Sequence, residues 1–164
     1  MTFLSLMRAE VFPSYLENAI LGYAQDCVAS RRWPSEGAIE RSRADFENSL
    51  PQGLATPDNY FYEIKTSKSG SVVGVIWFAV EEKHGLRNAF VYDLEIKPEH
   101  RRHGHAFRAF VLIESIVSAL GLDSIGLHVF SQNRGAQSLY EKLGYVVTGI
   151  NMQKRLSELA AQSQ

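Results

Sequence analysis

The 164-residue sequence contains a single cysteine, almost no net charge and no long apolar run. Cys27 has no second cysteine with which to form an internal disulfide, which fits a reducing, cytoplasmic compartment. The formal net charge of −1 argues against a general nucleic-acid binder, since such proteins usually carry a large basic excess. The longest apolar stretch, residues 72–80, is shorter than the roughly 20 residues of a membrane-spanning helix. We therefore expect a cytoplasmic protein whose partners include neither nucleic acid nor membrane.

Several common sequence features are also missing. No repeat or low-complexity block is visible, and the N-terminal residues lack the basic-then-apolar plan of a signal peptide. Neither a G-x-G-x-x-G after a strand nor a G-x-x-x-x-G-K-[ST] string is present, which disfavours the dinucleotide-binding and P-loop folds. The 45% apolar and 21% charged residues are typical of a globular protein. We expect a single domain over residues 1–156 and a loose polar tail over 157–164.

The first 60 residues predict a strand followed by two helices. A short apolar run at residues 2–7 indicates the strand, and apolar residues at helical spacing predict a helix over 14–32. Ser35 is expected to be the N-cap of a second helix that continues to Ser49 and ends before a loop containing proline and glycine.

The middle of the chain is rich in β-branched and aromatic residues. Three stretches separated by glycine-containing turns indicate an antiparallel meander, namely residues 60–65, 72–81 and 88–96. In the third stretch, regular alternation predicts that four apolar side chains share one face: Phe90, Tyr92, Leu94 and Ile96. The same alternation places Asp93 and Glu95 together on the opposite face.

The second half indicates alternating helices and strands. We expect a helix over 104–120, a strand over 124–130, a helix over 133–143 and one or two closing strands within 145–156. The strand–helix–strand order over 88–130 is a βαβ unit, whose two strands should be parallel. The whole predicts an α/β (α+β) fold with a mixed, mostly antiparallel central sheet and helices on both faces.

The most informative segment joins a strand to a helix at residues 97–106. Backbone N–H groups at a helix start lack partners within the helix, so such a junction is suited to bind an anion. The basic residues here are Arg101, Arg102, His103, His105 and Arg108, and the small ones are Gly104 and Ala106. Two other interpretations stay open. One is a solvated basic turn. The other is a metal site formed by His100, His103 and His105, which is disfavoured because a zinc site normally has four defined ligands.

This segment resembles the acetyl-CoA-binding motif of the GNAT N-acetyltransferase superfamily. That motif is [Q/R]-x-x-G-x-[G/A] after a strand ending apolar-x-apolar-x-Pro, and Arg101, Gly104 and Ala106 match it. A second GNAT signature, N-x-x-A-x-x-[LF]-Y-x-x-x-G-[FY], is matched by Asn133, Ala136, Leu139, Tyr140, Gly144 and Tyr145. The two signatures occur in the family's order, and the resemblance covers about residues 72 to 150. It implies a GNAT-like fold with a parallel βαβ cofactor unit.

The resemblance also implies that acetyl-CoA is the cosubstrate. N–H groups of the loop would hold its pyrophosphate, and the strand around Leu94 and Ile96 would pair with its pantetheine amides. Asn133 would hydrogen-bond it from the start of the last helix. The expected cofactor-binding residues are Leu94, Ile96, Arg101, Arg102, His103, Gly104, His105, Ala106, Asn133 and Tyr140. No metal ion is expected.

Acetyl transfer to an amine needs a base and an acid, because an alkylammonium with a pKa of about 10 is unreactive at neutral pH. Tyr140 matches the family's general acid, although its helical spacing also fits packing in the core. Glu95 and His128 are the candidate bases, and several family members have a glutamate at the strand position of His128. The alternatives are a Glu95–arginine ion pair, a core role for His128, or a relay of water molecules.

The leading hypothesis is an acetyl-CoA-dependent N-acetyltransferase that acts on a primary amine, of a small molecule or a peptide, by direct attack in a ternary complex. The alternative is a non-catalytic acyl-CoA-binding or regulatory module of the same fold. RNA binding through the basic cluster around Arg101 is disfavoured by the weak overall charge. Three arginines of the first half either indicate an anionic acceptor or are ordinary surface residues: Arg31, Arg32 and Arg41. The oligomeric state is not determined by the sequence, and a homodimer is one alternative.

Overall fold

The computed structural model describes residues 1–66 and 70–157 and contains a five-stranded sheet in the order β1-β2-β3-β4-β5. The strands are β1 (Thr2–Leu6), β2 (Asn59–Thr66), β3 (Val72–Lys83), β4 (Leu86–Ile96) and β5 (Ile125–Leu127). Strands β1 to β4 are antiparallel to their neighbours, whereas β5 runs parallel to β4. Because α3 (His105–Ala119) connects β4 to β5, the predicted βαβ unit is confirmed.

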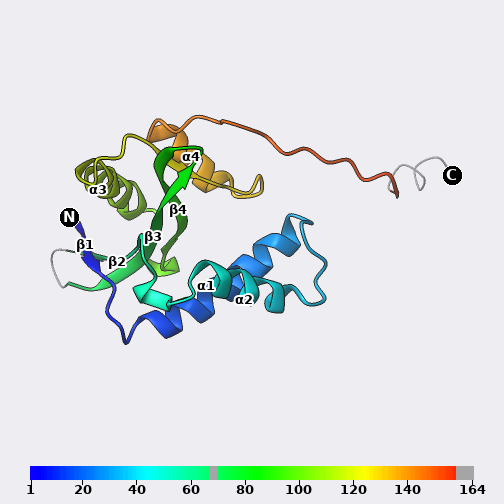
Figure 1. Ribbon diagram of the computed structural model, residues 1–164, viewed down its shortest axis with the longest axis horizontal. Helices are drawn as coiled ribbons and strands as arrows, with labels where there is room; N and C mark the ends of the chain where they lie inside the picture. Colours follow the sequence, from blue (N-terminus) through cyan, green and yellow to red (C-terminus); the bar gives the residue numbers. More distant parts are fainter. Residues whose placement is uncertain (67–69, 158–164) are drawn as a thin grey trace.

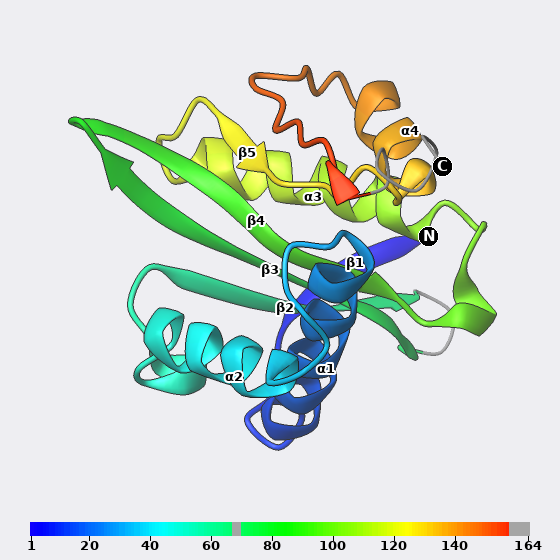
Figure 2. The same cartoon turned by 90° about the vertical axis from the view of Figure 1, so that its right-hand side faces the viewer.

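Helices cover both faces of this sheet, as Figures 1 and 2 show. Helices α1 (Phe12–Ala29) and α2 (Ala38–Ser49) lie on one side, and α3 and α4 (Arg134–Lys142) lie on the other. Two short 3-10 turns, η1 (Gly53–Ala55) and η2 (Pro98–His100), complete the described elements. The predicted fold class is therefore confirmed. None of the helices in the described residues is both long and apolar enough to cross a membrane.

Two hydrophobic cores, one on each side of the sheet, hold these layers together. On the α3 side, Ile76 and Phe78 of β3 belong to the same buried cluster as Phe110. On the α1 side, the intervening Trp77 belongs to a second buried cluster with Tyr15. Strand β3 is thus buried on both faces, which explains why its sequence is a nearly continuous apolar run.

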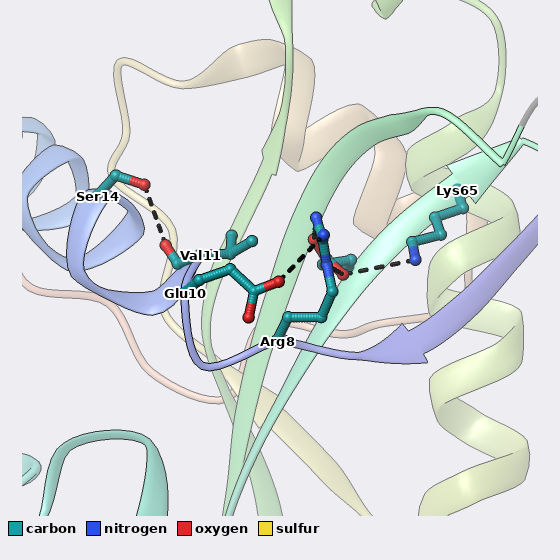
Figure 3. Close-up of polar contacts among 6 residues, drawn as sticks. Arg8, Glu10, Val11, Ser14 and Lys65 are labelled. Atoms are coloured by element: carbon teal, nitrogen blue, oxygen red, sulfur yellow. Dashed lines mark hydrogen bonds and ion pairs between the residues drawn. The ribbon is translucent and has the colours of Figure 1, made fainter.

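A small polar cluster fastens the segment after β1 to β2. Figure 3 shows Arg8 and Lys65 approaching one carboxylate from different sides. That carboxylate belongs to Glu63, whose side chain is 0% exposed; its oxygens lie 3.2 and 3.3 Å from Arg8 nitrogens and 3.5 Å from Lys65 Nζ. A buried carboxylate is costly unless it is paired and hydrogen-bonded. The two cations therefore explain how this edge of the sheet accommodates Glu63.

The starts of two helices show how local chemistry sets their ends. Helix α2 begins at Ala38, and the residue before it, Gly37, adopts a left-handed conformation with φ of 70°. Ser35 contributes only its carbonyl oxygen, which accepts from the Ala38 N–H, so the predicted Ser35 cap is wrong. By contrast, Asn133 does cap α4, since its Oδ1 accepts from the Ala136 N–H at 3.2 Å.

The closing strands predicted within 145–156 are not formed in the described chain, so that prediction is wrong. The Tyr145 N–H donates to the Tyr140 carbonyl, and the chain then runs in extended form away from the sheet (Figure 1). Extended residues count as a strand only when a neighbouring strand pairs with them, and no described segment of this copy lies beside them. Apart from Ser157, the tail expected over 157–164 lies outside the described residues.

Candidate active site

Strands β4 and β5 separate at the end of the sheet where the predicted motifs lie. Their parallel pairing covers only three residues of each strand, and its last pair joins Val91 to Leu127. Beyond Val91, residues 93–96 of β4 are paired with β3 alone. The predicted cofactor-binding residues Leu94 and Ile96 are therefore on a strand with one free edge, to which another extended chain of amides can add.

A β-bulge at Tyr92 accompanies this separation. In the pairing of β3 with β4, Trp77 lies opposite Asp93 and Phe78 lies opposite Val91, so Tyr92 is an extra residue. A bulge of this kind bends a strand and interrupts its regular alternation. The strand therefore opens away from β5 at the point where the parallel pairing stops.

The bulge also changes which side chains of β4 share a face. Leu94 and Ile96 pack against the core on the α3 side, as does Val91 before the bulge. Tyr92 instead stacks on Trp77, with ring centroids 4.7 Å apart, on the α1 side. The prediction that Tyr92 shares a face with Leu94 and Ile96 is therefore wrong, because the extra residue changes the alternation.

Asp93 is the most perturbed carboxylate at this opening. Its Oδ2 accepts a hydrogen bond of 2.9 Å from the hydroxyl of Tyr15, a buried residue of α1. Burial raises the pKa of Asp93 to about 6; the nearby charge of Glu95 also raises it, while the hydrogen bond from Tyr15 lowers it. A carboxylate that is ionised at neutral pH but titrates near 6 is suited to take up a proton.

Tyr140 reaches the same region from α4. Its ring packs edge-on against Phe110 and Tyr145, with centroids 5.3 and 5.8 Å away, so the packing role that its helical spacing predicts is present. Burial raises the pKa of Tyr140, and the charge of Asp93 raises it further. The hydroxyl therefore keeps its proton at neutral pH and lies within electrostatic reach of a carboxylate that can accept one.

The bases predicted from the sequence occupy two different places. Glu95 is exposed, and its charge acts on both Asp93 and Tyr15, which places it on the α1 side of β4. His128 directly follows β5 and has its ring edge-on to Phe130 at 4.9 Å. Partial burial lowers the pKa of His128, and the charge of Arg32 lowers it further, so both favour the neutral imidazole. The role of either residue as a base stays a prediction.

The end of α1 borders the opening from the other side. Gln132, in the loop before α4, donates to the Asp26 carbonyl at 3.4 Å, and Arg32 lies close enough to influence His128. Arg41 has a different role, because its guanidinium donates to the carbonyls of Pro34 and Glu36 and thereby holds the loop between α1 and α2. Of the arginines that hint at an anionic acceptor, Arg32 thus lies near the opening, whereas Arg41 supports the loop between α1 and α2.

The loop from Arg101 to Ala106 lies at the end of β4. Arg102 and Gly104 both adopt left-handed backbone conformations, with φ of 64° and 78°. In the described residues, the N–H of Arg101 bonds to Pro98 and that of Arg108 to Gly104, while the N–H groups of 102–107 have no acceptor. A run of free N–H groups at a helix start is a concave anion site.

Side chains support this loop from behind. Arg101 donates from Nε to the Ile96 carbonyl at 2.9 Å, which ties the loop to the end of β4. Arg108 donates to the His103 carbonyl at 2.6 Å and to Thr2 Oγ1 at 2.9 Å, and thereby links the loop to β1. Sequence reasoning counted Arg108 only as positive charge and missed Thr2, because no local signal relates residues 106 positions apart.

The histidines of the loop differ in surroundings. His103 is exposed, whereas His105 lies 2.9 Å from Thr2 Oγ1 through Nδ1. Burial and the charge of Arg108 lower the pKa of His105, so both favour the neutral imidazole. The His105 ring centroid is 6.5 Å from that of His100 and 6.4 Å from that of His103. In residues 1–66 and 70–157, no group of three or more His, Cys, Asp or Glu side chains is arranged to hold a metal ion.

Substitution of Gly104 by alanine is expected to lower the affinity for acetyl-CoA by about tenfold or more, with a well-folded protein. Gly104 has a left-handed φ of 78°, and an added Cβ would lie 2.7 Å from Nη1 of Arg108, the side chain whose Nη2 holds the His103 carbonyl. The measurement is calorimetric titration with acetyl-CoA. Gly22→Ala is the matched control, because a Cβ there meets no atom within 4 Å. Equal affinity of the two variants would contradict the anion-site assignment.

Comparison with known proteins agrees with this geometry. The model of the acetyltransferase (GNAT) family matches residues 18–145. The chain is 33% identical over 153 residues to the uncharacterized N-acetyltransferase YycN of Bacillus subtilis (strain 168), covering 93% of this chain and 97% of YycN. It is 31% identical over 150 residues to the uncharacterized N-acetyltransferase YdgE of the same strain, covering 92% and 95%. The crystal structure of YycN superposes with a TM-score of 0.89 at 32% identity, covering 95% of this chain and 99% of YycN. The chain belongs to the GNAT family of acetyltransferases.

Proposed function

We propose that the protein transfers an acetyl group from acetyl-CoA to a primary amine by direct attack in a ternary complex. The observation that carries this proposal is the arrangement at the open end of β4. The free edge of β4 ends at the loop of unpaired N–H groups, and the charge of Asp93, on this part of β4, acts on Tyr140. GNAT membership supports the acetyl donor, and the perturbed acid–base pair supports catalysis over passive binding.

The residues present fit acetyl-CoA. The free N–H groups of 102–107 would hold the pyrophosphate, and a Cβ at Gly104 would displace the Arg108 guanidinium that supports this loop. The edge of β4 around Leu94 and Ile96 would pair with the pantetheine amides, as an added strand does. Asn133 uses its Oδ1 to cap α4 and keeps its amide nitrogen available to donate. When bound, acetyl-CoA supplies the activated acetyl thioester.

The chain's own residues handle the two protons of the reaction. As the new N–C bond forms, the amine must lose a proton, which the Asp93 carboxylate takes up directly or through a water molecule. As the C–S bond breaks, the departing sulfur gains a proton, which the Tyr140 hydroxyl donates. Glu95 and His128 remain the alternative bases. A substrate that arrives as an ammonium ion first releases one further proton to water, and after turnover the proton held by Asp93 returns through water to the Tyr140 phenolate.

The acceptor side of the opening favours a cationic substrate. Two carboxylates act on a third there: the charges of Glu95 and Asp26 both raise the pKa of Asp93. Arg32 adds one positive charge near His128. An amine that arrives as an ammonium ion is attracted by such carboxylates and loses its proton beside them. We infer a primary amine, of a small molecule or a peptide, as the acceptor class.

Calorimetric titration of the folded protein with acetyl-CoA tests the proposal first. We expect one acetyl-CoA to bind each chain, and an amine screen with release of free thiol to identify acceptors that turn over. A folded protein that does not bind acetyl-CoA would contradict the proposed function outright. Binding with only slow hydrolysis, and no active acceptor among amines and peptides, would instead support a non-catalytic acyl-CoA-binding module.

A further inference from the structure

Thr2, the first residue of β1, contacts the start of α3 through a buried hydroxyl. The residue is only 7% exposed, although β1 is the outermost strand on its side of the sheet. Its Oγ1 lies 2.9 Å from Nδ1 of His105 and 2.9 Å from Nε of Arg108. Buried polar groups are costly unless they are paired, and α3 provides both partners here. One side chain thus joins the edge of the sheet to the helix that follows the loop of residues 101–106.

The chemistry of the three groups sets the direction of both hydrogen bonds. A guanidinium can only donate, so Thr2 Oγ1 accepts from Nε of Arg108. The single hydroxyl proton of Thr2 also needs an acceptor, and the structure places Nδ1 of His105 within reach of it. Burial and the charge of Arg108 lower the pKa of His105, and the neutral ring that they favour can accept at Nδ1. Thr2 therefore accepts from one side chain of α3 and donates to another.

Arg108 carries this connection into the loop. Its Nη2 donates to the His103 carbonyl at 2.6 Å, while its Nε is held by Thr2. The His103 carbonyl and the Gly104 N–H belong to one planar trans peptide group, in which the two bonds point in opposite directions. A guanidinium that holds the carbonyl behind the loop therefore turns the Gly104 N–H toward the front. This N–H is one of the free groups of 102–107 that suit an anion.

The choice of a hydroxyl as the partner of Arg108 also preserves positive charge. The partners that the structure gives this guanidinium are a hydroxyl and a carbonyl oxygen, and both are neutral. A carboxylate at the position of Thr2 would hold Arg108 equally well but would cancel its charge. With Thr2, the loop is both fixed in shape and backed by an uncompensated cation, which favours an anion in front of it.

We propose that Thr2 is a positioning residue for the pyrophosphate of acetyl-CoA. It acts through Arg108 and His105, which together fix the His103–Gly104 peptide and the first residue of α3. This inference rests on the proposed function, since it assumes that acetyl-CoA is the ligand of the loop. It adds that β1, an element outside both sequence signatures, sets how tightly the donor is bound.

Two substitutions of Thr2 separate its hydroxyl from its shape. Thr2→Val keeps the branched side chain that suits a strand and removes the hydroxyl, whereas Thr2→Ser keeps the hydroxyl. Calorimetric titration with acetyl-CoA should show a Kd about tenfold higher for Thr2→Val and within about threefold of the native value for Thr2→Ser. Rescue by serine would assign the effect to the hydroxyl.

A truncated donor separates positioning of the pyrophosphate from general damage to the fold. Acetylpantetheine carries the same thioester but lacks the pyrophosphate and the nucleotide. With an acceptor that turns over, Thr2→Val should raise KM for acetyl-CoA about tenfold and change kcat by less than about threefold. Its kcat/KM with acetylpantetheine should stay within about threefold of the native value. A loosened fold would instead lower the rates with both donors.

Arg108→Lys provides a second, independent variant. Lysine keeps the positive charge, but its single ammonium group cannot hold both Thr2 and the His103 carbonyl as the guanidinium fork does. The Kd for acetyl-CoA should rise about tenfold, and Thr2→Val added to Arg108→Lys should raise it by less than about threefold more. Such non-additive effects show that two residues act through one contact.

The outcomes distinguish this inference from the proposed function. A native protein that does not bind acetyl-CoA would overturn both. If the native protein binds, unchanged affinity in Thr2→Val would overturn the role of Thr2 alone, as would a loss in Thr2→Ser equal to that in Thr2→Val. Equal losses with acetyl-CoA and acetylpantetheine would reduce Thr2 to a structural residue. Should Thr2→Val not fold, unchanged affinity in Arg108→Lys would overturn the inference by itself.

Discussion

Replacement of Tyr140 by phenylalanine is expected to lower kcat by about 10²-fold or more while the affinity for acetyl-CoA changes by less than about threefold. The phenyl ring retains the edge-on packing against Phe110 and Tyr145, so the fold is kept. Only the hydroxyl is lost, and with it the proton that the departing sulfur needs. Steady-state rates of thiol release, together with calorimetric titration of acetyl-CoA, separate the two effects.

Tyr145 provides the matched control for this substitution. Its hydroxyl is buried and has no hydrogen-bond partner in the described residues, and its ring lies beside that of Tyr140. Tyr145→Phe therefore removes the same group a short distance away, and kcat should be retained. An equal loss of kcat in both variants, or an equal loss of acetyl-CoA affinity with kcat, would reduce Tyr140 to a packing residue.

Substitution of Asp93 by asparagine is expected to have an effect of similar size and to change the pH profile as well. In the native protein, kcat should fall as the pH drops below about 6, because Asp93 takes up a proton there and can no longer act as a base. In Asp93→Asn, kcat should be lower by about 10²-fold and this acidic limb should disappear. The measurement is kcat against pH with saturating substrates.

Two further variants decide whether the acidic limb belongs to Asp93. Tyr15→Phe removes a hydrogen bond that lowers the pKa of Asp93, so the limb should move to higher pH. Glu95→Gln removes a negative charge that raises the pKa of Asp93, so the limb should move to lower pH but persist. Loss of the limb in Glu95→Gln, with its retention in Asp93→Asn, would transfer the role of base to Glu95.

Asp93→Asn, which lowers kcat, should at the same time stabilise the folded protein above about pH 6. Folding raises the pKa of Asp93 from its ordinary value of 3.8 to about 6, so the folded chain binds this proton more tightly than the unfolded chain. The favourable contribution is therefore present at low pH and is lost as the pH rises through this interval. Asp93→Asn should raise Tm above pH 6, while asparagine still accepts from Tyr15.

Much of the cofactor side of the site could be predicted from the sequence, because its determinants are local. A strand end, a loop with small residues and a helix start follow one another between Leu94 and Ala106, and each has its own sequence signal. Asn133 is similar, since an asparagine just before a helical pattern predicts a cap. The structure contains each of these local elements, and the binding of acetyl-CoA by their residues stays a prediction.

The proposed base, Asp93, could be predicted less well than Tyr140, because its pKa depends on contacts between distant residues. Asp93 acquires its raised pKa through burial beneath α1 and contact with Tyr15, which is 78 residues away. Nothing near Asp93 in the sequence distinguishes it from Glu95, two positions later. The prediction of closing strands was wrong for a related reason. Residues 145–156 have the composition of a strand, but a strand also requires a neighbouring strand edge, which composition does not specify.

The extra residue in β4 also bears on how this family can vary in length. Tyr92 has no partner residue on β3. Its deletion would therefore leave Val91 and Leu94 facing α3 and Asp93 facing α1, so that both hydrophobic cores keep their side chains. The strand would, however, lose its bend, and the ladder with β5 could continue past Leu127 across the opening. A single-residue deletion could thus preserve the fold and close the site, so the backbone of residue 92 matters more than its side chain.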